Sequence, residues 1–220
     1  IYEEPKYKEA LTRLGEFLML AQMPDPQPGW AQQYNYDMQP IWARRFEPPG
    51  VSGDETQEAI ESLIKIHHVT GEKRFLEPIP IALAYLRRSL LPDGQLARYS
   101  ELKSNRPLYM SRRGDHYSLT YDDSDLPQHY GWKTASRLNE LRKEYASAES
   151  DRAPRMPSVP DARRVRALID ELDEQGRRLS TAKAGERLVA QPKIPAGSQY
   201  LSSELFSKNL EALSEFIEGQ

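Results

Sequence analysis

Residues 7–21, with the sequence YKEALTRLGEFLMLA, carry the pattern that decides the predicted fold. Within this stretch, Leu11, Leu14 and Leu18 recur at steps of three and four residues, which places them on one face of an amphipathic helix. The following residues 24–29 contain three prolines and an aspartate, which end a helix and begin a loop. This part of the chain therefore predicts a helix with one buried stripe, followed by a loop.

Two more helices are predicted next along the chain. One begins beside its cap, either Ser52 or Asp54, and stops at Gly71. The other covers about residues 74–91, with two prolines near its first turns, so that it can begin later than its apolar pattern suggests. The loops after the first and third helices share the order Pro-Asp, Gly, Ala and Tyr. This similarity favours stacked helical hairpins, although two unrelated turns are the alternative. We therefore predict a mainly all-α fold.

Residues 98–132 lack periodicity and mix aromatic residues with arginine, asparagine and histidine. Long loops of this kind in compact domains are usually binding or active-site segments. After this loop we place a domain boundary near Thr134, which divides the chain into residues 1–134 and a helical extension, 135–220. The extension contains a proline-rich linker near residues 147–160.

The extension carries apolar stripes over residues 161–172, where Asp161 is the predicted cap, and over residues 206–217. Such short helices are marginal alone in water, so they are expected to pack on the main domain or on a protein partner.

Composition narrows the classes of function. Thirty Lys and Arg against 33 Asp and Glu leave a formal net charge of -3, which gives no general attraction to nucleic acid or to an anionic membrane. The chain has no cysteine, which excludes disulfides and cysteine-based zinc sites. No stretch is apolar and long enough to span a membrane. The start at Ile1, without Met, suggests a processed protein or a fragment.

One run of residues combines rigidity with cationic groups. In Trp42–Gly53, WARRFEPPGVSG, two adjacent arginines precede a proline turn that leads into a helix. A guanidinium held by such a turn can pair in bidentate fashion with the carboxylate of a uronic acid. The alternative is that Arg44 or Arg45 only forms an ion pair with Glu47.

This run resembles a sequence of the pectic acid lyases, polysaccharide lyase family 10. Arg44, Glu47 and the residues of 48–53 match its Ala-Arg-x-aromatic-Glu-Pro-Pro-x-x-Ser-Gly pattern. Residues 29–34 are similar to the family's Trp-x-Gln loop, and three later segments follow in the family's order: 105–109, 113–115 and 130–132. The resemblance covers about residues 1–133 and belongs to the C-terminal part of the family's catalytic domain.

The resemblance implies an α/α toroid of helical hairpins that cleaves polygalacturonate, an acidic polysaccharide, by β-elimination. It implies Arg106 as the catalytic base and Arg44 as a ligand of the substrate carboxylate. An arginine that stabilises the developing negative charge is the milder alternative for Arg106, because arginine is always protonated in proteins. Further substrate-binding residues implied by the matching segments are Asn105, Tyr109, Arg113 and Trp30.

The resemblance also implies calcium as a cofactor and a secreted or periplasmic location. The resemblance places the family's acidic calcium ligands upstream of residue 1, so we expect the toroid and its calcium site to be incomplete here, and the metal ligands are unknown. A non-catalytic carbohydrate-binding or scaffold domain is therefore the alternative to an active pectate lyase. Residues 122–125, DDSD, are a candidate replacement calcium site, with a solvated turn as the alternative.

The histidines and tryptophans leave alternatives open. His67 and His68 are adjacent, so on a helix they point about 100° apart and do not readily share a metal. His116 and His129 are candidates for an acid or a base beside the aromatic loop, without an assigned carboxylate partner. The three tryptophans are candidates for stacking on sugar faces or for burial in the core.

Overall fold

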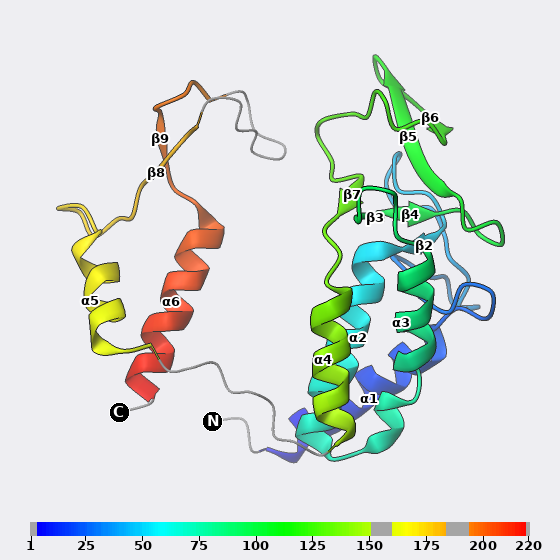
Figure 1. Ribbon diagram of the computed structural model, residues 1–220, viewed down its shortest axis with the longest axis horizontal. Coiled ribbons are helices and arrows are strands. Elements are labelled where there is room, and N and C mark those ends of the chain that lie inside the picture. Colours follow the sequence, from blue (N-terminus) through cyan, green and yellow to red (C-terminus); the bar gives the residue numbers. More distant parts are fainter. Residues whose placement is uncertain (1–3, 151–159, 184–193, 219–220) are drawn as a thin grey trace. The chain divides into compact units, whose positions relative to one another are not determined.

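The computed structural model describes residues 4–150, 160–183 and 194–218. It divides into two compact units, residues 1–154 and residues 155–220 (Figure 1). The two units are described separately. The first unit contains the four α-helices α1 (Pro5–Ala21), α2 (Gly53–Thr70), α3 (Ile79–Arg88) and α4 (Leu138–Glu149), with a short 3₁₀ helix, η1 (Lys73–Leu76).

Helix α2 is central to the first unit and packs against α1, α3 and α4. Both of its predicted ends are confirmed. The Ser52 hydroxyl accepts a hydrogen bond from the Glu55 amide, and Gly71 ends the helix in the left-handed conformation, with φ of 77°. The third predicted helix is split by its prolines into η1 and a later α3, because proline lacks the amide that a helix interior requires.

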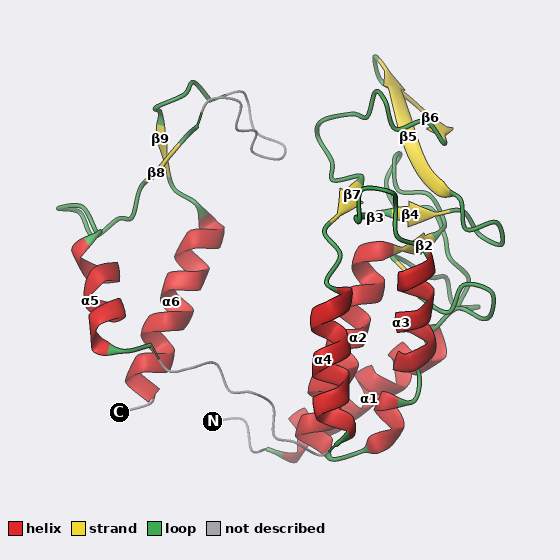
Figure 2. Ribbon diagram, in the orientation of Figure 1, coloured by secondary structure: helices red, strands yellow, loops and turns green. Residues whose placement is uncertain are grey.

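The prediction of a mainly all-α fold, and with it of an α/α toroid, is wrong. Helices account for 44% and strands for 15% of the described residues, so the fold is mixed (Figure 2). A five-stranded antiparallel sheet has the order β1-β2-β4-β5-β6. Its strands are β1 (Trp30–Ala31), β2 (Val51–Ser52), β4 (Tyr99–Ser100), β5 (Pro107–Arg113) and β6 (His116–Thr120). A separate pair joins β3 (Leu96–Ala97) to β7 (Lys133–Thr134).

The strands of this sheet are not predicted from the sequence, for a physical reason. Three of its strands contain two residues each, which is too short to show the alternation of a strand. In β5 the three successive residues 108–110 are all buried, so burial does not alternate there either. The hairpin of β5 and β6 turns at Gly114, which has φ of 61°, a conformation that favours glycine.

Two clusters of buried side chains form the core of the first unit. The larger cluster lies among the four helices and includes Ile60, Leu63 and Phe75. The smaller cluster joins the sheet to the following loop through Tyr109, Met110 and Trp132. The predicted boundary near Thr134 lies before α4, whereas α4 packs against α2 and α3 and the compact units divide after residue 154.

The second unit consists of α5 (Ala162–Asp170), a two-stranded pair of β8 (Ser180–Thr181) and β9 (Gln199–Tyr200), and α6 (Ser203–Glu218). Asp161 caps α5 as predicted, because its carboxylate accepts a hydrogen bond of 2.7 Å from the Arg164 amide. Helices α5 and α6 pack against each other. Among the described residues of the chain, no helix is long and apolar enough to cross a membrane.

Candidate functional site

The loop that precedes β2 is tied to the protein through a buried carboxylate. Glu47 is 2% exposed. Its oxygens accept hydrogen bonds from the Arg44 amide at 3.1 Å, from Arg44 Nη1 at 3.2 Å and from the Tyr130 hydroxyl at 2.9 Å. Gln32 Nε2 lies 3.4 Å from the same carboxylate. Because a buried charge is tolerated only when donors surround it, these contacts explain how Glu47 remains in the interior.

A pair of tyrosines extends this network into the sheet. The Tyr99 and Tyr130 hydroxyls lie 2.8 Å apart, and Tyr99 also donates a hydrogen bond to Gln32 Oε1. Burial raises the pKa of Tyr99 and of Tyr130, so both remain neutral and serve as donors. Glu47, Gln32, Tyr99 and Tyr130 are called the buried network below.

The solvent side of the same loop carries cationic and aromatic groups. The Arg44 side chain is 69% exposed, although one of its nitrogens contacts Glu47. Arg45 is exposed beside it, and Trp42 is 47% exposed. Since an arginine has five N–H donors, one contact with Glu47 leaves most of the Arg44 guanidinium available to a ligand. The loop of residues 42–47 thus presents two guanidiniums and an indole to solvent.

Arg106, the predicted catalytic base, has different surroundings. Its guanidinium carbon lies 3.6 Å from the centre of the Tyr121 ring, and the Tyr121 hydroxyl donates a hydrogen bond to Glu101. Hydrogen bonds from Ser104 and Tyr121, together with the charge of Arg106, lower the pKa of Glu101. A guanidinium over an aromatic face is held by a cation–π contact. Arg106 is therefore oriented by Tyr121.

Asn105 anchors the backbone beside Arg106. Its side-chain oxygen accepts hydrogen bonds from Gln27 Nε2 at 3.0 Å and from the Tyr85 hydroxyl at 2.7 Å, and its amide donates to Ser89 Oγ at 2.9 Å. Its φ of 57° lies in the left-handed region, which asparagine tolerates better than most residues. Asn105 therefore anchors the turn through contacts within the protein.

The remaining predicted site residues lie apart from one another. Trp30 is 2% exposed and its indole nitrogen donates to the Leu18 carbonyl at 2.7 Å, while Tyr109 is 2% exposed in the sheet cluster. Arg113 is exposed at the hairpin end, opposite His116. Arg44 and Arg106 share no hydrogen-bond, ion-pair or ring partner among the described residues. Arg44 thus contacts the buried network through Glu47, whereas Arg106 contacts Tyr121.

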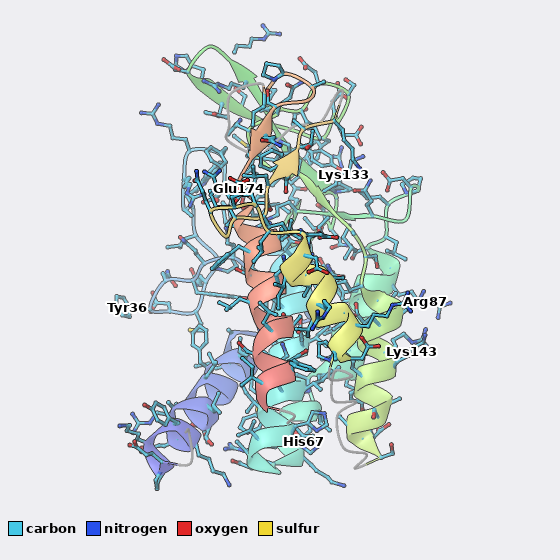
Figure 3. All side chains as sticks on the ribbon, turned by 90° about the vertical axis from the view of Figure 1, so that its left-hand side faces the viewer. Tyr36, His67, Arg87, Lys133, Lys143 and Glu174 are labelled. Carbon is cyan, nitrogen blue, oxygen red and sulfur yellow. The ribbon has the colours of Figure 1, made fainter. Side chains whose placement is uncertain are left out.

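A cavity of about 920 Å³ lies among α1, the loop after β1, and α2. Its walls are mostly apolar, and its charged lining residues are Glu55 and Glu58. Burial and the neighbouring charges of Glu55 and Asp54 raise the pKa of Glu58. Tyr36 lines the cavity and projects outward (Figure 3). Because its charged lining residues are acidic, this cavity repels an anionic polymer. The loop of residues 42–47, which carries two arginines, is the better surface for such a polymer.

The candidate metal ligands have other partners. In the acidic run, the Asp122 carboxylate accepts a hydrogen bond of 2.9 Å from the Ser124 amide, and Asp123 pairs with Lys133 at 2.7 Å. The Asp122 contact is typical of a turn, and the Asp123 contact is an ion pair. In the part of the chain that the structure describes, no group of three His, Asp or Glu side chains is placed to hold a metal ion. We therefore assign no calcium ligand.

The histidines also occupy ordinary structural positions. His67 is buried, and its Nδ1 lies 3.2 Å from the Glu72 carbonyl oxygen. His129 Nε2 lies 3.2 Å from the Tyr117 hydroxyl, and its ring packs edge-on against Phe46 at 4.8 Å. Burial and the charge of Arg112 lower the pKa of His129. His129 thus belongs to the aromatic packing.

No family model and no curated protein matches this sequence. The resemblance to pectic acid lyases therefore rests on the quoted segments alone. The ion pair of Arg44 with Glu47, which the sequence offers as the alternative to substrate binding, is present. The tyrosines and the glutamine of the buried network were not predicted as a unit, because they come from distant segments: Tyr130 lies 83 residues from Glu47, and Tyr99 lies 67 residues from Gln32.

Proposed function

We propose that this chain binds a uronic-acid polymer of the polygalacturonate type through the loop of residues 42–47. The observation that carries the proposal concerns Arg44. Its guanidinium is exposed to solvent, and one of its nitrogens is bonded to the buried carboxylate of Glu47. A guanidinium with a fixed orientation loses little conformational entropy when a planar carboxylate binds. Trp42, exposed in the same loop, offers an apolar face to a sugar ring.

We further propose that this binding serves a polysaccharide lyase. In β-elimination a base removes the C5 proton, the C4–oxygen bond breaks, a double bond forms between C4 and C5, and the C4 oxygen leaves with the rest of the polymer. Negative charge develops on the uronate carboxylate, so a guanidinium bound there lowers the barrier. Arg44 is suited to this role. Arg106, stacked on Tyr121, is suited to stabilising charge on a neighbouring residue of the polymer.

A non-catalytic carbohydrate-binding domain is the second candidate. It is favoured by one observation, namely that Arg44 and Arg106 have no common partner among the described residues. Binding without cleavage needs only the surface of residues 42–47, whereas cleavage also needs a base.

Binding is tested by titrating the chain with a galacturonic acid trimer and measuring the heat of binding. We expect Arg44→Ala to weaken binding by about tenfold or more, since a charge-assisted bidentate contact is lost. Arg13→Ala is the matched control, because Arg13 is similarly exposed and also has a single glutamate partner. A methyl-esterified trimer should not bind. Equal effects of the two substitutions would refute the proposed site.

Cleavage is tested separately with polygalacturonate and calcium, by following the ultraviolet absorbance of the unsaturated product. If the chain is a lyase, Arg106→Ala should reduce the rate strongly while binding through Arg44 persists. Binding without any increase in absorbance would support the non-catalytic candidate and contradict the lyase.

A further inference from the structure

Helix α6 of the second unit has two apolar stripes. One stripe includes Ala212, which is 5% exposed, and the half-buried Leu205 and Phe216. The other, called the exposed stripe below, consists of Phe206, Leu210, Leu213 and Ile217. Three of its members are 67%, 52% and 73% exposed: Phe206, Leu210 and Ile217, respectively. Contiguous apolar surface of this kind on a small unit marks an interaction site.

The spacing of the exposed stripe fits helix pairing. Its residues are four, three and four positions apart, which is the alternation of a coiled-coil seam. The stripe extends over twelve residues, or roughly 17 Å of helix at 1.5 Å per residue. The occupant of this stripe is therefore expected to be another helix of similar length.

The charges on α6 identify the kind of helix that fits. The positions flanking the seam are Ser207, Asn209, Ser214 and Phe216, none of which is charged. The charged residues lie on the outer face, where Lys208 pairs with Glu204 at 2.5 Å. Since flanking charges determine partner choice in coiled coils, their absence allows an identical helix to approach without repulsion.

The two stripes are offset by one residue, which is about 100° around the helix. Each helix of a four-helix bundle contacts two neighbours at about this angle. Helix α5, which packs beside α6 (Figure 1), also keeps Ile169 in solvent, at 52% exposed, and Leu172, just after the helix, is 40% exposed. The second unit thus has the surface of half a bundle.

We propose that the second unit is a dimerisation module, in which two copies of this chain pair α5 and α6 into an antiparallel four-helix bundle. The exposed stripes of the two α6 helices face each other, with Phe206 against Ile217 and Leu210 against Leu213 of the second copy. A two-fold axis makes this interface self-complementary, as in most homodimers. The proposal is independent of any carbohydrate function.

Sedimentation equilibrium of the full chain tests the proposal, with a mass of two chains as the expected result. Leu210→Glu should weaken dimerisation by about a hundredfold or more, because it places two unpaired carboxylates in the seam. Leu20→Glu is the matched control, since Leu20 on α1 is 68% exposed. Circular dichroism verifies that both variants keep their helical content. A monomeric wild type, or a dimer that only Leu20→Glu dissociates, would overturn the proposal.

Cross-linking tests the antiparallel arrangement. Because the chain has no cysteine, Phe206→Cys and Ile217→Cys each introduce a single thiol. Under mild oxidation, a mixture of the two variants should form the mixed disulfide, while each variant alone should remain largely uncross-linked. Efficient disulfides within either variant alone, and none between the two, would indicate parallel helices and contradict the proposal.

Discussion

Arg44 and Arg106 are the two arginines to which the family resemblance assigns a role, and the structure supports them in opposite ways. Arg44 lies over a carboxylate that is 2% exposed and bonded to the interior. Arg106 lies over an aromatic ring, whose hydroxyl contacts Glu101 near the surface. A binding group can therefore be oriented either by the core, as Arg44 is, or by a local surface contact, as Arg106 is. Only the contact of Arg44 with buried Glu47 links a candidate site to the stability of the fold.

The largest expected effect is that of removing the buried carboxylate. Glu47→Ala leaves the Tyr130 hydroxyl and the Arg44 amide without their acceptor, which should lower the free energy of unfolding by about 3 kcal/mol. Urea denaturation measures this loss. Glu101→Ala, on the Arg106 side, should leave the denaturation midpoint almost unchanged. A similar loss in both variants would remove the distinction between the two arginines.

The next largest effect concerns the backbone beside Arg106. Asn105→Ala removes an acceptor shared by Gln27 and Tyr85 and places alanine at φ of 57°, so we expect a loss of about 2 kcal/mol. Asn105→Gly removes the same hydrogen bonds without the backbone strain, because glycine adopts this φ readily, so its loss measures the hydrogen bonds alone. A midpoint of urea denaturation equal to that of the wild type in Asn105→Ala would show that the turn is not anchored by this side chain.

A smaller effect is expected for single hydroxyl groups. Tyr99→Phe leaves Gln32 Oε1 without its hydroxyl donor in the interior, which should cost about 1 kcal/mol. Tyr121→Phe keeps the ring on which Arg106 stacks, and its lost contact with Glu101 is at the surface. Thermal denaturation of the pair should therefore show a lower melting temperature for Tyr99→Phe only.

The smallest effect is a pH dependence on the Arg106 side. The folded-state pKa of Glu101 is lowered from 4.5, so its contribution to stability is present above pH 4.5 and is lost as the pH falls through the folded pKa. Compared with Glu101→Gln, the wild type should therefore lose stability between pH 4.5 and the lower folded value. Urea denaturation at several acidic pH values measures the difference, and parallel curves for the two proteins would contradict this role of Glu101.

Sequence patterns predict the helical half of the fold well because local signals determine it. Ser52, Gly71 and Asp161 cap or stop helices at the predicted positions. The sheet could not be predicted, since two-residue strands pair through contacts that are distant in the sequence. The ion pair of Arg44 and Glu47 could be offered from the sequence, as the alternative to substrate binding, because the two residues are three positions apart. Tyr99 and Tyr130 join it only in the folded chain.

The long sequence separation in the buried network has a consequence for folding kinetics. Glu47 contacts Tyr130 across 83 residues, and Gln32 contacts Tyr99 across 67. Contacts that close such long loops carry a large entropic cost and tend to form after local helices. Substitutions here should therefore mainly accelerate unfolding and leave the folding rate little changed. The support of Arg44 is then expected to assemble late, after the helices of the first unit have formed.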